Sequence, residues 1–459
     1  MLLQRRFGPF AFAGALALAG FVVAHSVTAQ PAIEWRRGDV FFRLGGRPSF
    51  LLGRNPTGTT PEMFGAYFAQ AVNSGEKLVR IHLTVGFPQT TKAGEMDEAW
   101  AARWDSVFDA AAAKDIGVLP VFDAWADWND GSRGEQWHRW DKNPYNVANG
   151  GPARRPAGLF ENGECQRLWL RWLDQLVHRW QARPNIIGWE IFSELDLITG
   201  GTEETAVPFI HAAATVIHEA DERRRPVTAS LSGVREWTSL FRSDALDIVQ
   251  VHPYGRNLDE MILRTVRRRQ ADYDKPVLIG ECGLDPAGPG GIASAPRAEI
   301  GIRHAIWAAM ISGAMNGRML WWEDGYDFYS GRNLRQRYKN IAATAAAFAR
   351  DVNFADFRPV EMLAADGLKG GAIGNDHIIL GWFRDAKCEP PEWPVRLMTG
   401  RRVTLKLPQQ STQGSVEFRN PVGGSRRETQ TVSTQSGQLE IALPDFEDAI
   451  AFVVRRDAR

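Results

Sequence analysis

Residues 186–196 read IIGWEIFSELD and are the most informative segment of the sequence about its fold. Their apolar side chains predict a buried strand, and Glu194 stands near the point where that strand ends. Residues 276–283, PVLIGECG, repeat the arrangement with Glu281. Two apolar strands that each end in a glutamate indicate a fold that delivers both carboxylates to one pocket.

Around this stretch, short apolar segments alternate with amphipathic helices. The predicted strands are residues 49–55, 77–85, 116–122, 186–193, 226–232, 246–252, 276–281 and 318–322. The predicted helices are residues 61–74, 97–115, 163–182, 203–222, 258–271, 296–314 and 333–351. Such alternation indicates parallel strands with right-handed crossovers, and a count of eight favours a closed (β/α)8 TIM barrel in the α/β class. A dinucleotide-binding fold is disfavoured because no G-x-G-x-x-G turn follows the first strand.

The two ends of the chain follow other patterns. Residues 1–29 have the features of a cleaved signal peptide: Arg5 and Arg6, an apolar run at 10–24, and small residues before the expected cleavage site. We therefore expect a secreted or periplasmic protein with no membrane partner after cleavage. The barrel domain is expected at 31–354, beginning with a β-hairpin at 33–48. A C-terminal β-sandwich is expected at 355–459, with strands at 378–384, 402–407, 415–418, 428–433, 438–443 and 449–454.

The composition of the chain argues against nucleic acid and metal ions as binding partners. Lysine plus arginine and aspartate plus glutamate both number 54, so the formal net charge is zero and nucleic acid is not an expected partner. The three cysteines Cys165, Cys282 and Cys388 neither form a disulfide scaffold nor have zinc-type spacing. We expect no metal, no other cofactor and a monomer.

Several side chains that could take part in catalysis or binding directly follow the predicted strands. The active sites of such barrels lie at these strand ends. The side chains are Asn55, Arg80 with His82, Asp123 with Trp125, Ser193 with Glu194, His252 with Tyr254, Glu281, and Trp321-Trp322 with Glu323 and Asp324. Two carboxyl groups with aromatic faces suit cleavage of a sugar bond. The loop 123–145 adds Trp125, Trp128, Trp137 and Trp140, which we interpret as sugar-stacking platforms. The alternative is that two or more of them pack beneath the loop.

These residues resemble the retaining β-glycosidases of clan A, and most closely glycoside hydrolase family 5, the cellulase and β-mannanase group. The resemblance rests on the strands ending in Glu194 and Glu281, on His252-Pro253-Tyr254, on Arg80 in LVRIHL, and on Trp322. It covers most of residues 33–350, and residues 361–455 are similar to the small β-domain attached to several such barrels.

The resemblance implies a role for each matching residue. Glu194 would be the general acid/base and Glu281 the nucleophile of a double displacement, with Tyr254 and Arg80 holding Glu281 and Trp322 lining the −1 subsite. The residue before the acid/base is usually an Asn that binds the sugar 2-OH, and Ser193 replaces it here. The substrate-binding residues that we expect are Arg80, Ser193, His252, Tyr254, Trp322, Trp125 and Trp128.

The expected function is that of a secreted retaining β-glycoside hydrolase acting on a β-linked polysaccharide or oligosaccharide such as β-mannan or β-glucan. Two alternatives stay open. One is an exo-acting β-glycosidase or transglycosylase, and the other is an inactive barrel that binds carbohydrate.

Overall fold

The computed structural model describes residues 33–57, 60–84, 92–286, 288, 291–322, 338, 341–407 and 413–456. The predicted signal segment, Glu323, Asp324 and the first part of the helix predicted at 333–351 lie outside these residues. Among the helices described, none has the length and apolar character needed to cross a bilayer.

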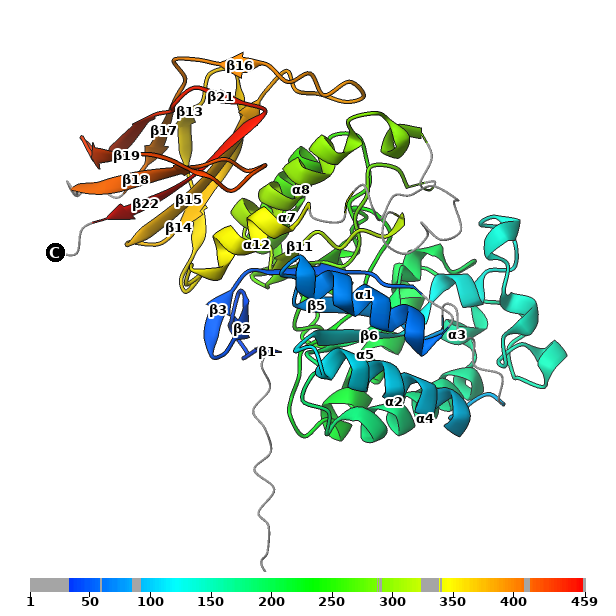
Figure 1. Ribbon diagram of the computed structural model, residues 1–459. Coiled ribbons are helices and arrows are strands. Elements are labelled where there is room, and N and C mark those ends of the chain that lie inside the picture. Colours follow the sequence, from blue (N-terminus) through cyan, green and yellow to red (C-terminus); the bar gives the residue numbers. More distant parts are fainter. Residues whose placement is uncertain are drawn as a thin grey trace, which may run out of the picture. The chain divides into compact units, whose positions relative to one another are not determined.

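Eight parallel strands of the described chain form the barrel (Figure 1), as predicted. They are β4 (Leu51–Arg54), β5 (Leu78–His82), β6 (Gly117–Ala124), β7 (Trp189–Ser193), β8 (Val227–Thr228), β9 (Val249–Val251), β10 (Val277–Ile279) and β11 (Asn316–Gly317). One sheet has the order β11-β4-β5-β6-β7-β8, and β9 pairs with β10. Two 2.9 Å hydrogen bonds close the remaining gaps, from Asp247 N to Val227 O and from Met315 N to Val277 O. The barrel prediction is confirmed.

Helices surround these strands, and most of them bury one face, whereas the helix Ala298–Ser312 is buried on nearly all sides. They are α1 (Pro61–Asn73), α2 (Glu98–Ala112), α3 (Gly158–Glu161), α4 (Gly163–Trp180), α5 (Glu203–Ala220), α6 (Thr238–Arg242), α7 (Leu258–Tyr273), α8 (Ala298–Ser312) and α12 (Ala343–Arg350). In α2, Asp97 caps the first turn by accepting from Trp100 N at 2.9 Å. Trp100, Trp104 and Phe108 then fall on the buried face, as their helical spacing predicts.

The last barrel strand differs from its prediction. We predicted residues 318–322, but the strand consists of Asn316 and Gly317, and Leu320 pairs separately with Cys282 in an isolated parallel bridge. The cause is Arg318, whose φ of +73° leaves the extended region and ends the strand. Trp321 and Trp322 therefore lie beyond the strand, at the rim of the barrel.

A small antiparallel sheet precedes the barrel, formed by β1 (Ile33–Glu34), β2 (Phe42–Leu44) and β3 (Arg47–Ser49). Gly45 and Gly46 connect β2 to β3 with φ of +57° and +79°, a two-residue turn that glycine permits at both positions. The side chains of Ile33 and Phe42 pack into the same hydrophobic cluster as the barrel strands β4 and β10. The predicted hairpin is thus present.

The C-terminal strands build antiparallel sheets with a core of their own. They are β12 (Arg358–Val360), β13 (Met362–Ala364), β14 (Leu368–Gly374), β15 (Ile378–Asp385), β16 (Leu397–Met398), β17 (Arg402–Lys406), β18 (Gln413–Arg419), β19 (Arg426–Ser433), β20 (Gln438–Ala442), β21 (Phe446–Glu447) and β22 (Ala449–Arg456). One sheet has the order β12-β14-β15-β22-β18-β19, and β13-β17-β20 forms another. The predicted β-sandwich is confirmed.

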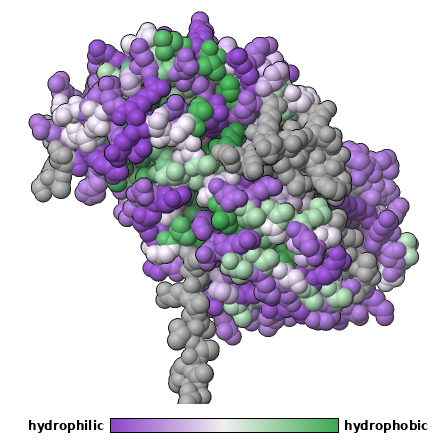
Figure 2. Space-filling view, viewed as in Figure 1, coloured by the Kyte–Doolittle hydropathy of each residue, from purple (hydrophilic) through white to green (hydrophobic). Residues whose placement is uncertain are grey.

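This β-domain is bonded to α7 and α8 through buried ion pairs. Arg384 Nε lies 2.6 Å from Asp259 Oδ2, and Asp448 Oδ1 lies 2.6 Å from His304 Nε2. Trp382 and Trp393 bury their rings in the same cluster as α8. The visible face of the molecule is mostly hydrophilic (Figure 2), and most large apolar side chains are buried in the interior.

Candidate active site

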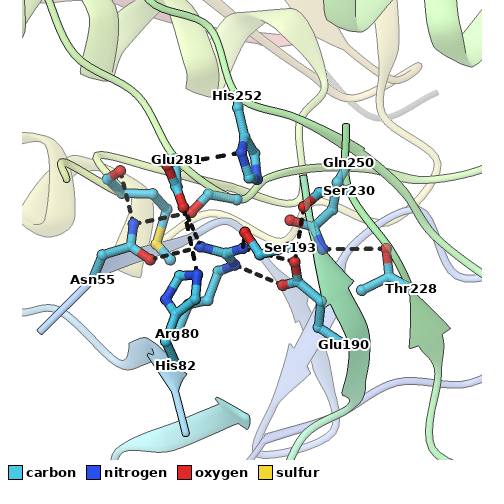
Figure 3. Close-up of polar contacts among 12 residues, drawn as sticks. Asn55, Arg80, His82, Glu190, Ser193, Thr228, Ser230, Gln250, His252 and Glu281 are labelled. Atoms are coloured by element: carbon cyan, nitrogen blue, oxygen red, sulfur yellow. Dashed lines mark hydrogen bonds and ion pairs between the residues drawn. The ribbon is translucent and has the colours of Figure 1, made fainter. Parts of the chain in front are cut away.

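Glu281 follows β10 and is held by donors from two other strands. Arg80 Nη1 donates to Glu281 Oε1 at 2.8 Å, and the Tyr254 hydroxyl donates to Oε2 at 2.9 Å. Burial, followed by the charge of Glu281, raises the pKa of Tyr254 well above its usual range, so the phenol keeps the proton that it donates. Figure 3 shows His82 beneath the same carboxylate, with its Nε2 3.7 Å from Oε1. This environment suits a carboxylate that reacts as a nucleophile.

Arg80 also binds a second glutamate inside the barrel (Figure 3). Its Nε and Nη2 lie 2.6 and 2.7 Å from the two carboxylate oxygens of Glu190, and both side chains are fully buried. Burial opposes ionisation of Glu190, but the Arg80 charge outweighs it and lowers the pKa of that carboxyl. Arg80 further donates to Asn55 Oδ1 at 3.2 Å and to Ser193 Oγ at 3.0 Å. One guanidinium therefore joins four strands beneath the pocket.

Glu194 has the opposite environment. Its backbone is left-handed, with φ of +58°, an uncommon conformation for a residue with a side chain and one often seen at functional sites. Its N–H donates to Ser230 Oγ at 3.1 Å, and its Oε1 lies 2.9 Å from His252 Nδ1. Burial, and then the negative charge of Asp196, raise the pKa of Glu194 to about 8. A carboxyl that keeps its proton at neutral pH can act as a general acid.

The two glutamates face each other across a pocket of about 380 Å³. One carboxylate oxygen of Glu194 and one of Glu281 lie within 4.8 Å of each other. The walls are largely aromatic, with Trp125, Trp137, Trp321 and Trp322 lining the pocket together with Tyr254. Trp137 contacts two of the other tryptophans, because its ring centre lies 6.2 Å from that of Trp125 and 6.0 Å from that of Trp322.

Three of the expected substrate-binding residues do not line this pocket. Arg80 and His252 are both fully buried and contact the glutamates from behind, so a substrate cannot reach them. Trp128 is also fully buried, and its Nε1 donates to Asp123 Oδ2 at 2.9 Å. The prediction of a stacking surface at Trp128 is therefore wrong, and Trp140 is buried beside it. Ser193, Tyr254, Trp322 and Trp125 do line the pocket.

Two residues of the site, His82 and Glu190, were assigned no role in the sequence analysis. His82 was noted at a strand end, but only the structure shows it lining the pocket beside Glu281. Glu190 interrupts an otherwise apolar strand, as Arg80 does in LVRIHL, and a charge in a buried strand calls for an opposite one. The ion pair between Glu190 and Arg80 could therefore have been predicted from these two charges in apolar strands.

Trp137 lines the pocket whereas Trp128 is buried in the core, so their replacement should have different effects. Replacing Trp137 by Ala removes part of the open pocket wall, and we expect KM for an oligosaccharide to rise by on the order of tenfold with little change in Tm. Replacing Trp128 by Ala leaves a cavity in the core and should cost about 3–5 kcal/mol of stability. Thermal unfolding and steady-state kinetics on both variants test this. A loss of Tm in the Trp137 variant equal to that in the Trp128 variant would contradict the assignment.

Two groups of described side chains could each offer three metal ligands: His304, Cys388 and Asp448, and Glu194, His252 and Glu281. In both groups an arginine already neutralises a carboxylate. Arg303 lies 2.8 Å from Asp448, and Arg80 lies 2.8 Å from Glu281. A guanidinium at that distance opposes binding of a cation, so neither group fits a metal well.

A larger groove of about 610 Å³ lies elsewhere, between residues 35–40, 274–276 and 357–359. Lys275 and Pro276 directly precede β10, so this groove is at the amino-terminal end of the barrel strands. Active sites of (β/α)8 barrels lie at the opposite end, where Glu194 and Glu281 are.

Comparisons with known proteins agree with this architecture. No model of a protein family and no curated protein matches the sequence. Solved structures do match the fold. A glycoside hydrolase family 5 protein from Bacteroides vulgatus has a TM-score of 0.66 at 13% identity, covering 93% of this chain and 94% of its own.

Two further similar structures have named activities. An endo-β-1,4-mannanase from Thermotoga petrophila has a TM-score of 0.53 at 13% identity, over 88% of this chain and 98% of its own. A family 30 subfamily 8 xylanase from Clostridium acetobutylicum has a TM-score of 0.53 at 12% identity, over 89% and 97%. The chain therefore has the fold of clan A glycoside hydrolases, and the resemblance to family 5 is confirmed at the level of the fold.

Proposed function

We propose that this chain, with its clan A barrel, is an exported retaining β-glycoside hydrolase that acts on a β-linked polysaccharide or oligosaccharide of the β-mannan or β-glucan type. The observation that carries the proposal is the pair of unlike carboxyls: Glu194, whose pKa is raised to about 8, lies within 4.8 Å of Glu281, which accepts a hydrogen bond from Arg80. Retaining enzymes place their carboxyl groups about 5–5.5 Å apart, whereas inverting enzymes need roughly 6.5–9.5 Å to admit a water. The mannanase with the same fold supports the choice of substrate.

The reaction has two steps. Glu281 attacks the anomeric carbon and forms a glycosyl ester, while Glu194 gives its proton to the departing glycosidic oxygen. Glu194, now a carboxylate, then takes a proton from a water molecule. The water oxygen attacks the anomeric carbon and releases Glu281, so the configuration is retained after two inversions. The pocket tryptophans supply faces on which the sugar rings stack.

The proposal is tested by incubating the protein with nitrophenyl β-glycosides and with mannan, glucan and xylan. Product sizes show which polymer is cut and whether the cut is internal, and NMR at early times shows the anomer that forms first. We expect hydrolysis with the β-anomer released first. Absence of hydrolysis on the whole panel would overturn the activity, and an α-anomer released first would overturn retention.

The raised pKa of Glu194 predicts a specific pH dependence. Because only protonated Glu194 can donate, kcat/KM should fall as the pH rises through about 8. In Glu194→Gln this alkaline limb should disappear, and residual activity should be confined to dinitrophenyl glycosides, whose leaving group needs no proton. Asp196→Asn is the control, because removing a charge that raises the pKa of Glu194 should move the limb to lower pH.

The same group affects stability with a defined sign. Folding raises the pKa of Glu194 from 4.5 to about 8, so between these values the folded state holds more protons than the unfolded state. Stability is therefore lost as the pH rises through this window. Tm of the wild type should fall more between about pH 5 and about pH 9 than Tm of Glu194→Gln. Equal slopes would show that Glu194 does not carry the raised pKa.

A further inference from the structure

His82 lies in the wall of the catalytic pocket, at the end of β5. Arg80 is two positions earlier on the same strand, so both side chains point into the barrel. The Nδ1 atom of His82 is buried and has no hydrogen-bond partner among the described residues. Its Nε2 atom lies 3.7 Å from Glu281 Oε1, which is too long for a direct hydrogen bond (Figure 3). An imidazole that leaves a buried nitrogen unpaired does not help the fold, so its presence here indicates a function.

The imidazole of His82 is uncharged. Burial, followed by the positive charge of Arg80, lowers the pKa of His82 well below its usual range, so the contact with Glu281 is not an ion pair. A neutral imidazole has one N–H donor and one acceptor nitrogen. Because Nδ1 is buried, Nε2 is the nitrogen that a ligand in the pocket meets. Trp321 packs edge-on against the ring, with 4.8 Å between the ring centres, and holds this nitrogen beside the nucleophile.

The proposed reaction brings one sugar hydroxyl to this nitrogen. The anomeric carbon bonds to Glu281 in the first step, and the carbon next to it carries the 2-hydroxyl, so that hydroxyl lies beside the Glu281 carboxylate. An oxygen about 2.8 Å from both His82 Nε2 and Glu281 Oε1 is compatible with the 3.7 Å between those two atoms. The hydroxyl then donates its proton to the carboxylate, which can only accept, and its oxygen accepts from Nε2–H. One sugar oxygen thus bridges the two side chains.

The hydroxyl groups in the described pocket wall already have protein partners. They belong to Ser193, Ser232 and Tyr254, which are bonded to Arg80, Asp196 and Glu281 respectively. Ser193 Oγ accepts from Arg80 at 3.0 Å and has only its own proton to offer to a sugar. His82 Nε2 has no such bond to a described residue, so it can bind a sugar hydroxyl without giving up another partner. His82 is therefore the better placed of the two to contact the 2-hydroxyl.

We propose that His82 is a substrate-binding residue that donates from Nε2 to the 2-hydroxyl of the sugar attacked by Glu281. The inference rests on the proposed function and names the part of the substrate that the site recognises. Hydrogen bonds to the 2-hydroxyl strengthen in the transition state, so the contact should act mainly on kcat. The 3.7 Å separation leaves room for one oxygen but not for an acetamido group. The preferred substrates are therefore β-glucosides or β-mannosides with a free 2-hydroxyl, and 2-acetamido sugars are excluded.

Dinitrophenyl glycosides with and without the 2-hydroxyl test the contact. A β-glucoside and a β-mannoside differ only at carbon 2, so one 2-deoxy glycoside is the reference for both. The ratio of kcat/KM between the better parent and the 2-deoxy compound measures the effect of the hydroxyl, and differences in intrinsic reactivity cancel when variants are compared. His82→Phe keeps a ring against Trp321 and should lower this ratio by on the order of tenfold, mainly through kcat. His82→Gln, whose amide nitrogen can take the place of Nε2, should keep most of it.

An unchanged ratio in His82→Phe would overturn the proposal. So would a ratio that falls in Ser193→Ala but not in His82→Phe, or a His82→Phe effect seen only with a 3-deoxy glycoside as the reference. Tm is a separate readout, because removing an unpaired buried nitrogen should leave Tm equal or higher.

A lower Tm in His82→Phe, with equal losses on the parent and 2-deoxy glycosides, would mean that His82 only supports the fold and would also overturn the proposal. If His82→Phe does not fold, His82→Leu is measured in the same way. A wild type that hydrolyses no glycoside would reject the proposed function and this contact with it. An active wild type whose ratio does not depend on His82 would reject this inference alone.

Discussion

Replacing Glu281 by Ala should reduce hydrolysis of every glycoside by at least about 10⁴-fold, because the covalent route to the product disappears. Glu281 is the carboxylate that Arg80 and Tyr254 hold at 2.8 and 2.9 Å, and neither donor can replace it as a nucleophile. The variant should still fold, since Ala leaves a small space that opens on the pocket. Initial rates on a dinitrophenyl β-glycoside measure the loss.

Azide distinguishes this role from that of Glu194. In Glu281→Ala, azide can enter the vacated space and attack the anomeric carbon once, which gives an α-glycosyl azide. In Glu194→Ala the glycosyl ester on Glu281 still forms, and azide attack on it gives the β-glycosyl azide. A β-azide from Glu281→Ala would show that the two roles are reversed. Glu203→Gln, a carboxylate of α5 bonded to Ser239 outside the pocket, is the control that should keep full activity.

The barrel could be predicted because its signal is repeated. Each apolar strand followed by an amphipathic helix adds to the same conclusion, and errors at single boundaries do not change it. The eighth strand shows how such an error arises. Arg318 adopts a positive φ that no apolar pattern reports, so the strand ends at Gly317 although the apolar residues continue to Trp322.

The candidate site was predictable where a residue's place in the chain determines its place in space. Glu194 and Glu281 follow strands, so the fold alone brings them to one end of the barrel. Trp125 and Trp128 are three residues apart in a loop without periodicity, and no sequence rule decides which one is buried. Burial was decided by Asp123, whose Oδ2 accepts from both Trp128 and Trp169 at 2.9 Å. Such long-range pairing is visible only in three dimensions.

Replacing Arg80 by Met should damage stability and activity together. The change leaves the fully buried carboxylate of Glu190 without its cation, and losing one partner of a buried ion pair costs about 3–5 kcal/mol. It also removes the charge beside Glu281, so kcat should fall by about 10²-fold or more through lost electrostatic stabilisation. Chemical denaturation and steady-state kinetics measure the two effects separately.

The double variant Arg80→Met/Glu190→Gln separates the two roles of Arg80. A neutral amide at position 190 needs no cation and can still accept from Ser230 Oγ, which lies 3.0 Å from Glu190 Oε1. Stability should therefore recover in part, whereas activity should stay low because Glu281 still lacks its cation. Arg54→Met is the matched control, since Arg54 is buried and paired with Glu76 but does not line the pocket. It should lose stability and, at a temperature where it is folded, keep kcat. Recovery of activity along with stability in the double variant would mean that Arg80 acts only on the fold, and that Glu281 needs no buried cation to react.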